Sequence, residues 1–351
     1  MRIAVVGAGV TGLAVAAELL RGGHDVRCYE AATPMEARSR GGTRIFRLAH
    51  RRPELVAWAA QARHLWDGWS AEAGEPLVGT EGTVVSSDVV PWAGAMAAAG
   101  APHAISDDPP PGLPASAPPG PFLLDPAGGA IRAAATGRFL LARAGSAVVG
   151  ERVTAVGVSG ERGVVTTAAG EDRFDSVVVT AGAGTAPLVA PIGVDVPSTL
   201  VHHARFTYPL RDAAATPPCW LEESSSWRAG FSTYQHLAGP GMWAVGGDLP
   251  AAETRWELGA DAVTQRSREI VGAYAGEVLD GVEPRVVETV HCDYADGLGD
   301  GLSAARVGPL LVLWGDNLFK LAPVIGRVAG AAAVELSLPD ELTAVAHDPR
   351  P

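Results

Sequence analysis

Three glycines near the N-terminus are spaced for binding the phosphates of a dinucleotide. Gly7, Gly9 and Gly12 follow the apolar run 3–6 and precede a stretch of helix-forming residues, 13–21. In this context the first glycine permits a tight turn, the second lets the backbone approach a pyrophosphate, and the third allows the helix to pack closely on the strand. The positive end of the helix dipole then attracts phosphate charge. The alternative is a glycine-rich turn in an α/β protein that binds no nucleotide.

An acidic residue, Glu30, ends the next apolar stretch, 26–29. Its carboxylate can accept hydrogen bonds from both ribose hydroxyls of a bound dinucleotide, and it would repel a 2′-phosphate. The glycine motif and this acid together favour dinucleotide binding, and they disfavour NADP. They do not decide between FAD and NAD.

A second group of residues could hold a negatively charged substrate. Arg44 and Arg47 lie three residues apart after a pair of glycines, and a guanidinium offers two parallel donors to a carboxylate. The alternative is two solvent-exposed arginines in an arginine-rich chain. Lys320 is the only lysine in the sequence. Two cations that share one anion tolerate burial only while that anion is present.

The elements that must position these residues alternate between strand and helix at both ends of the chain. Short apolar runs predict buried parallel strands at 3–6, 26–29, 177–179 and 310–314. Apolar residues at helical spacing, and stretches of helix-forming or small residues, predict helices at 13–21, 54–69, 131–144, 267–279 and 324–336. We expect the proline-rich segment 101–126 to be a loop without regular structure. Aromatic-rich segments between turns predict a β-rich region over 201–247.

Composition and charge exclude several classes of function. A chain of 351 residues is longer than one core usually serves, so we expect two domains. The net charge of −12 argues against nucleic-acid binding, and no apolar stretch is long enough to cross a bilayer. The three cysteines have neither metal-ligand spacing nor a disulfide framework, and we expect no signal peptide. These features predict a cytoplasmic protein without a metal site.

Four segments of the chain resemble the D-amino-acid-oxidase-like flavoproteins, in particular the branch of sarcosine, N-methyltryptophan and piperideine-carboxylate oxidases. The first segment is 7–30, and the second is 40–47, which is similar to the Ser-His-Gly-x-Thr-Arg-x-x-Arg of that branch. The third is the strand and small-residue turn at 177–182, and the fourth is 292–326. The β-rich middle of the chain resembles the branch in layout more than in residues.

The resemblance implies FAD as the cofactor. On this basis the residues expected to bind FAD are Gly7, Gly9, Gly12, Glu30, Arg40, Thr43, Arg44, Gly182, Cys292, Gly315 and Lys320. Cys292 and Tyr294 match a Cys-x-Tyr of the branch, in which the cysteine sulfur is bonded to the flavin 8α-methyl carbon. The resemblance therefore implies a thioether at Cys292 and a place beside the substrate for Tyr294. An ordinary buried cysteine is the alternative.

The resemblance also assigns roles in substrate binding. It implies that Arg44 lies beside the flavin and that Arg47 binds the substrate carboxylate. Lys320, in a segment similar to the Gly-His-Gly-Phe-Lys of the branch, would be the second cation on that carboxylate. The residues expected to be catalytic are Arg44, Arg47, Tyr294, Asn317 and Lys320.

The chain departs from the branch at three positions. Arg40 and Asn317 stand where the branch has histidines, and Ala244 stands where it has a lysine that activates oxygen. A nearby cation lowers the barrier to superoxide formation, so Arg40 or Arg44 is the expected substitute for that lysine. Without a substitute, the chain would be a slow oxidase or a dehydrogenase with another acceptor.

The sequence therefore predicts an α/β fold with a discontinuous Rossmann-like FAD-binding domain formed by 1–80, 131–200 and 290–351. An inserted β-rich substrate domain is expected at 81–130 and 201–289. The predicted function is removal of a hydride next to the amine of a small secondary or cyclic amino acid, with transfer to FAD and then to O2. The alternatives are an FAD dehydrogenase with a non-oxygen acceptor, an NAD-dependent dehydrogenase and a non-catalytic flavin-binding protein.

Overall fold

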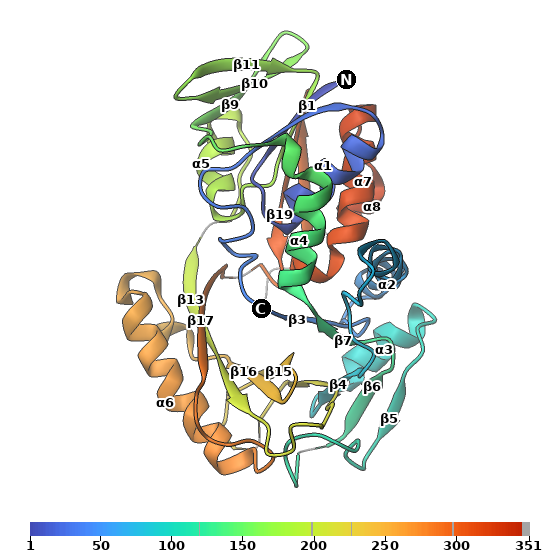
Figure 1. The fold of residues 1–351 in the computed structure, drawn as a ribbon, viewed down its shortest axis with the longest axis vertical. Coiled ribbons are helices and arrows are strands. Elements are labelled where there is room, and N and C mark those ends of the chain that lie inside the picture. The colour runs from blue at the N-terminus through green and yellow to red at the C-terminus, as the bar shows by residue number, and fades with distance from the viewer. Residues whose placement is uncertain (119, 198, 226, 297, 346–351) are drawn as a thin grey trace. The chain divides into compact units, whose positions relative to one another are not determined.

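The computed structural model of the chain describes residues 1–118, 120–197, 199–225, 227–296 and 298–345 (Figure 1). By its packing the chain divides into two units. Unit 1 comprises Met1–Gly41, Ala134–Thr199 and Ala295–Pro351, and unit 2 comprises Gly42–Ala133 and Leu200–Tyr294. Each unit is discontinuous in sequence. Unit 2 contains residues 42–80, 131–133, 200 and 290–294, which the sequence analysis assigned to the FAD-binding domain. The strand Arg44–Phe46 pairs with Gly129–Ile131, which also lies in unit 2, so unit 2 begins at Gly42 and not after residue 80.

Unit 1 is built on a six-stranded sheet in the order β18-β19-β12-β1-β2-β8. Its strands are β1 (Arg2–Val6), β2 (Asp25–Tyr29), β8 (Val148–Val149), β12 (Ser176–Val179), β18 (Gly301–Val307) and β19 (Leu310–Asp316). Neighbours from β19 through to β8 are parallel, and β18 is antiparallel to β19. The mostly parallel order confirms the predicted α/β class. Apolar runs form these strands because a parallel sheet is buried on both faces.

The helices of unit 1 are α1 (Val10–Arg21), α4 (Ala133–Ala144), α5 (Thr185–Val189), α7 (Ala322–Glu335) and α8 (Asp340–Ala344). Helices α1 and α7 pack closely at Gly326, which has no side chain. A Cβ atom there would lie only 2.8 Å from the Ala14 carbonyl oxygen. A separate antiparallel sheet contains β9 (Ala155–Ser159), β10 (Arg162–Thr167) and β11 (Gly170–Phe174).

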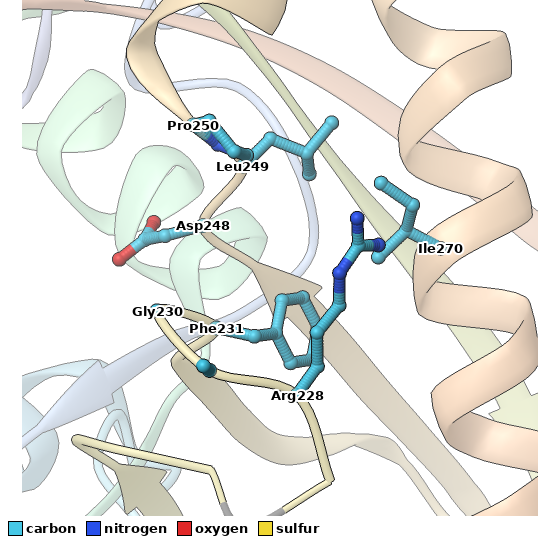
Figure 2. Close-up of a pocket in the computed structure, with 8 residues that line it drawn as sticks. Arg228, Gly230, Phe231, Asp248, Leu249, Pro250 and Ile270 are labelled. Atoms are coloured by element: carbon cyan, nitrogen blue, oxygen red, sulfur yellow. The ribbon is translucent and has the colours of Figure 1, made fainter.

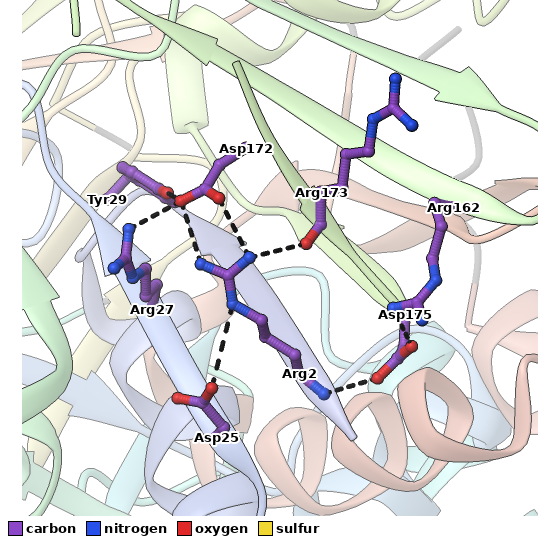
Figure 3. Close-up of polar contacts among 8 residues, drawn as sticks. All are labelled: Arg2, Asp25, Arg27, Tyr29, Arg162, Asp172, Arg173 and Asp175. Atoms are coloured by element: carbon purple, nitrogen blue, oxygen red, sulfur yellow. Dashed lines mark hydrogen bonds and ion pairs between the residues drawn. The ribbon is translucent and has the colours of Figure 1, made fainter. Parts of the chain in front are cut away.

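Figure 3 shows a network of ion pairs between the first strands of unit 1 and β11. The Arg2 Nη1 atom lies 3.0 Å from Asp172 Oδ1, and Arg27 Nη1 lies 2.6 Å from Asp172 Oδ2. Asp175 accepts the backbone N–H of Arg2 at 2.6 Å and also pairs with Arg162. The hydrogen bond from Arg2 is the largest cause that lowers the pKa of Asp172. Each of these three arginines therefore has a carboxylate partner.

Unit 2 contains an eight-stranded sheet in the order β17-β13-β16-β15-β14-β4-β6-β5. Its strands are β4 (Thr83–Ser86), β5 (Ala104–Ser106), β6 (Phe122–Asp125), β13 (Leu200–Pro209), β14 (Cys219–Glu222), β15 (Thr233–Gly239), β16 (Met242–Gly247) and β17 (Glu288–Ala295). A two-stranded sheet pairs β3 (Arg44–Phe46) with β7 (Gly129–Ile131). The helices are α2 (Pro53–Ala73), α3 (Val90–Ala98) and α6 (Ala260–Val278).

The two faces of this large sheet differ in chemistry. In β13, Ala204, Phe206 and Tyr208 belong to an apolar cluster that also contains residues of α6 such as Tyr274. Figure 1 shows α6, in orange, beside β13 and β17. Side chains alternate between the faces of a strand, so the residues between these apolar positions point to the opposite face. Among them is Arg205, which is 4% exposed. We call this opposite side the polar face.

Two expectations about secondary structure were wrong in detail. The proline-rich segment 101–126 contains the short strands β5 and β6, and β6 pairs with both β5 and β4. A short strand can form where neighbouring strands pair with its backbone. Phe122 and Leu123 of β6 are apolar and pair with residues of both β4 and β5. Helix α6 begins at Ala260, seven residues before the predicted start. None of the described helices combines the length and apolar character needed to cross a membrane.

Candidate functional site

The carboxyl ends of four parallel strands bring predicted cofactor residues to one edge of the unit 1 sheet. Gly7 follows β1, Glu30 follows β2, Gly182 lies beyond the end of β12, and Gly315 lies near the end of β19. The chain passes from β1 to β2 on one side of the sheet and later returns to β12 on the other side. Such a reversal of strand order opens a crevice at the carboxyl ends, where nucleotides bind in this class of fold.

Each of the three motif positions requires or favours glycine for a different structural reason. Gly7 has a φ of +103°, and a Cβ atom there would lie 2.6 Å from the Thr180 carbonyl oxygen. At Gly12 a Cβ atom would lie 1.8 Å from the Gly7 oxygen. Gly7 and Gly12 are therefore required by the turn and by helix packing. At Gly9 a Cβ atom would meet the Ser39 hydroxyl at 3.2 Å, so this position suits the close approach of a ligand.

Glu30 is held beside the glycine turn by two backbone amides. Its Oε2 accepts the Ala8 N–H at 2.8 Å, and its Oε1 accepts the Ala32 N–H at 3.0 Å. A carboxylate has about four acceptor positions, so two remain for ribose hydroxyls. The sequence analysis missed Ser39, whose Oγ accepts the Val10 N–H at 3.0 Å in the first turn of α1. These residues fit a dinucleotide.

Three other predicted cofactor residues of unit 1 are Gly182, Arg40 and Gly315, and local backbone structure accounts for them to different extents. Gly182 has a φ of +57°, and a Cβ atom there would lie 3.8 Å from Arg38 Cδ. Arg40 lies in the same loop as Arg38, and its N–H donates to the Ala37 oxygen at 3.2 Å. A Cβ atom at Gly315 would lie 2.2 Å from the Gly301 oxygen, so β18–β19 packing alone requires that glycine.

Lys320 and Asn317 are brought together in unit 1 by a residue that the sequence analysis did not single out as functional. Lys320 is 5% exposed, and its Nζ lies 3.5 Å from Asp300 Oδ1. Asn317 has a φ of +54° and donates from Nδ2 to the same oxygen at 2.7 Å. Asp300 therefore orients both side chains and offers the buried ammonium a counter-charge.

Arg47 lies in unit 2, directly after β3, and is 7% exposed. Its Nη1 is 3.4 Å from His50 Nδ1, and its guanidinium carbon is 5.1 Å from the Trp92 ring centre. The loop that carries it is fixed by Asp125, which accepts the Leu48 N–H at 2.5 Å. Burial is the main cause that raises the pKa of Asp125. This buried acid, which the sequence analysis missed, holds Arg47 in place.

The half-buried Arg44 lies at the start of β3 and shares an acceptor with the buried Arg205. Arg44 Nη1 donates to the Thr43 carbonyl at 2.8 Å, and Arg205 Nη1 donates to the same oxygen at 2.9 Å. Arg205 Nη1 is also 3.1 Å from His236 Nε2. His236 is opposite Ala244 across β15 and β16, and Ala244 is fully buried. The sequence analysis missed Arg205 and His236, although the alternation of polar and apolar residues in β13 was a usable signal for Arg205.

Cys292 and Tyr294 both lie in β17. Cys292 is a free, half-buried thiol. The Tyr294 ring centre is 6.1 Å from that of His203, whose Nε2 lies 2.7 Å from the Tyr234 hydroxyl. Burial lowers the pKa of His203. Burial first, and then the charge of Cys292, raise the pKa of Tyr234. Cys292 and Tyr294 therefore adjoin a second group of buried polar residues.

A small pocket in unit 2 lies apart from the predicted residues (Figure 2). It is lined by Arg228, Ala229, Gly230, Phe231, Asp248, Leu249, Pro250 and Ile270. Figure 2 shows the Arg228 guanidinium beside Ile270 and the Asp248 carboxylate turned away from it. No predicted site residue lines this pocket. In the part of the chain that the structure describes, no three His, Cys, Asp or Glu side chains are grouped to hold a metal ion.

The predicted site residues are divided between the two units. Unit 1 contains Gly7, Gly9, Gly12, Glu30, Arg40, Gly182, Gly315, Asn317 and Lys320, and unit 2 contains Thr43, Arg44, Arg47, Cys292 and Tyr294. Unit 1 thus carries the dinucleotide-type turn, and unit 2 carries two of the predicted arginines.

The chain is similar to known flavoproteins over nearly its whole length. Residues 2–331 match the model of a family described as FAD dependent oxidoreductase. No curated protein sequence matches the chain.

Several solved structures share the fold. NikD, an unusual amino acid oxidase essential for nikkomycin biosynthesis, is 22% identical with a TM-score of 0.81, over 99% of this chain and 98% of NikD. Iminodiacetate oxidase from Chelativorans sp. BNC1 is 19% identical with a TM-score of 0.76, over all of both chains. L-proline dehydrogenase from P. horikoshii is 16% identical with a TM-score of 0.74, over 96% of this chain and 94% of that one. The family match confirms the predicted resemblance, and the chain therefore belongs to the D-amino-acid-oxidase-like family of FAD-dependent oxidoreductases and is an enzyme.

Proposed function

We propose that this enzyme oxidises the C–N bond of a small secondary or cyclic amino acid and passes the electrons to O2. The observation that carries the proposal is the buried Arg47 at the end of β3, in a loop that Asp125 fixes. A guanidinium held in this way suits a carboxylate. The relatives named above, which are an amino acid oxidase, an iminodiacetate oxidase and a proline dehydrogenase, support an amino-acid substrate.

FAD supplies the hydride acceptor when it is bound. The residues that would hold it are the glycine turn, Glu30 and the first turn of α1 with Ser39. The substrate amine must be neutral, because its lone pair assists as the hydride leaves. Burial is the main cause that lowers the pKa values of His203 and His236, and the charge of Arg205 lowers both further. This charge acts in the same direction on an ammonium group beside it, and so favours the neutral amine.

We assign the substrate carboxylate to Arg47 and Lys320 together. Arg47 lies in unit 2 and Lys320 in unit 1, so energetic coupling between the two decides whether they act on one anion. Tyr294 and Asn317 are proposed to act beside the substrate. Arg44 and Arg40 are proposed to lie near the flavin.

The test is anaerobic reduction of the flavin, followed by its absorbance. A set of secondary and cyclic amino acids should bleach the flavin, and the corresponding amino amides should bleach it much more slowly. A protein bleached equally by acids and amides would lack the proposed carboxylate site. A protein bleached by none of these amines would not be an amino acid oxidase.

A dehydrogenase with another electron acceptor is the second candidate. It is favoured by Ala244, which is buried where the resemblance implies an oxygen-activating lysine. Measuring reoxidation of the reduced flavin in air distinguishes the two candidates. Reoxidation faster than turnover supports the oxidase, and slow reoxidation that Ala244→Lys accelerates supports the dehydrogenase.

We also propose that Cys292 is bonded to the flavin. Its free, half-buried thiol is available for such a bond. Acid precipitation should leave the flavin with the polypeptide, and Cys292→Ser should release it. A polypeptide mass equal to the bare chain would contradict the thioether while leaving FAD binding intact. All three cysteines are free thiols, which supports the cytoplasm as the expected compartment.

A further inference from the structure

Arg205 is a buried cation on the polar face of the unit 2 sheet. It pairs with Gly246 across β13 and β16, and His236 pairs with Ala244 across the adjoining strands β15 and β16. Cross-strand partners share a face, and so do residues two apart on one strand. Arg205 and His236 therefore lie on the same face. Gly246 and Ala244 on β16 are small, and the Tyr234 ring lies over Gly246, so Arg205 and His236 share this face with Tyr234.

The contacts of Arg205 leave its charge unbalanced. Its Nη1 donates to the Thr43 carbonyl at 2.9 Å and to His236 Nε2 at 3.1 Å. Its Nε is buried and has no hydrogen-bond partner. Among the described residues, no Asp or Glu pairs with Arg205. Removing a guanidinium from water without an anion is costly, so an anion is expected beside it.

His236 cannot supply the missing negative charge. Its Nδ1 lies 3.0 Å from the Leu237 carbonyl oxygen, which can only accept, so Nδ1 carries the proton. Its Nε2 therefore accepts from Arg205. Burial first, and then the charges of Arg205 and Arg44, lower the pKa of His236 to about 3. The imidazole is neutral near pH 7, so it orients Arg205 without neutralising it.

Thr43 adds a second unused donor at the same place. Its side-chain Oγ1 is buried without a hydrogen-bond partner, and the residue is 8% exposed. Its carbonyl accepts from both Arg205 and Arg44, so two guanidinium groups meet at one backbone oxygen. The Arg205 Nε–H and the Thr43 hydroxyl are donors of the kind that a carboxylate accepts.

We propose that Arg205 and Thr43 bind a second carboxylate of the substrate, so that the enzyme prefers amino dicarboxylic acids. The inference rests on the proposed function, in which Arg47 binds the first carboxylate. Thr43 and Arg47 are four residues apart, a backbone separation of at most about 14 Å. The long side chains of Arg205 and Arg47 can therefore reach opposite ends of one small molecule.

The first experiment measures binding without turnover. Succinate, a dicarboxylate that has no amine, is added to the holoenzyme, and its effect on the thermal midpoint gives an apparent affinity. Succinamate, in which one carboxylate is an amide, is the matched probe. Succinate should bind the parent more tightly than succinamate does. Arg205→Gln should weaken succinate binding roughly ten- to a hundredfold and leave succinamate nearly unchanged.

Arg211→Gln is the control variant, because Arg211 is exposed and donates to the Asp280 carbonyl. It should bind succinate as the parent does. A second variant, His236→Glu, keeps Arg205 but gives it a carboxylate from the protein, so it should lose succinate binding as well. Should Arg205→Gln fail to fold, His236→Glu still decides. Either variant binding succinate as tightly as the parent overturns the proposal, and so does a parent that does not distinguish succinate from succinamate.

The second experiment measures preference in the reaction. N-methylaspartate should reduce the flavin of the parent faster than N-methylasparagine, and Arg205→Gln should remove this difference. Equal rates in the parent overturn the inference about the second carboxylate. If no amine reduces the flavin, the proposed function fails, whereas the succinate measurement still decides whether Arg205 binds a carboxylate.

Discussion

Arginines serve opposite purposes in two regions of the molecule. In unit 1, Arg2 of β1 and Arg27 of β2 both reach Asp172, and the Arg2 side chain is 33% exposed (Figure 3). On the polar face of the unit 2 sheet, Arg205 is 4% exposed and has a carbonyl and a neutral imidazole as partners. The first network contains its own counter-charge and joins strands. The second leaves the buried Arg205 Nε–H without an acceptor, and this is the observation on which the proposed second carboxylate site rests.

The largest effect is expected where a buried arginine is proposed to meet substrate. Arg47→Met should lower kcat/KM, because a partly buried charged hydrogen bond to the substrate is lost. The loss of transition-state stabilisation should be about 2–4 kcal/mol. Arg2→Met should change kcat/KM of the folded enzyme by less than about twofold, since surface ion pairs contribute little and Arg2 is not proposed to touch substrate. The measurement is steady-state kinetics with a reactive secondary amino acid. Similar losses in both variants would erase the contrast between the two regions.

Two carboxylates offer the same contrast in unit 1. Glu30 is proposed to bond the ribose of FAD, whereas Glu18 pairs with Arg21 on the surface of α1 at 2.5 Å. Glu30→Ala should weaken cofactor loading by about 1.5–3 kcal/mol, and Glu18→Ala should leave it unchanged. Flavin occupancy of the purified proteins is the measurement. In a covalently flavinylated protein, the loss should appear as slower attachment. Equal occupancy in both variants counts against the ribose assignment.

Burial of His236 beside Arg205 should also make the free energy of unfolding depend on pH. The folded His236 has a pKa of about 3, below its ordinary value of 6.5, so the unfolded chain binds a proton that the folded one refuses. This contribution is complete above pH 6.5 and is lost as pH falls toward 3, by about 2 kcal/mol at pH 5. His236→Gln should reduce the loss between pH 7.5 and 5, as measured by urea unfolding. An unchanged loss would show that His236 titrates normally.

The smallest effect is expected in the exposed network. The pKa of Asp172 is lowered chiefly by Arg2, so its contribution is present above about pH 4 and is lost as the carboxyl protonates. Asp172→Asn should cost about 0.2–1 kcal/mol, because the pair is one-third exposed, and salt should shrink the difference. Urea unfolding at low and high salt checks this. If Asp172→Asn reduced the free energy of unfolding by more than the roughly 2 kcal/mol expected for His236 at pH 5, the contrast between the two regions would be reversed.

Local patterns were sufficient to predict much of unit 1. The run 3–6, the glycine turn and Glu30 lie within one short stretch, and the strand, helix and strand formed there as expected. The short strand β6 escaped prediction because its partner β4 lies outside the proline-rich segment, and β5 forms only by pairing with β6. A proline-rich composition describes the loop around them and not the sheet that they join.

The missed site residues are those that only tertiary contacts reveal. Arg205 is separated by 162 residues from Thr43 and by 31 from His236. Asp125 is 77 residues from Leu48, whose amide it binds. The alternation of polar and apolar residues in β13 marks Arg205 locally, but its importance and that of Asp125 come from burial and from the groups around them. Ser39 was closer to detection, because it lies between two arginines just before the glycine pair.

The central claim is that buried cations recognise the carboxylate of an amino-acid substrate. The most direct test is a double-variant cycle of Arg47→Met and Lys320→Met, with flavin reduction measured against substrate concentration for an amino acid and for its amide. If both residues act on one carboxylate, the second removal costs less than the first by about 1 kcal/mol or more, and the amide shows little effect of either. Strictly additive losses, or an amide used as well as the acid, would contradict the account.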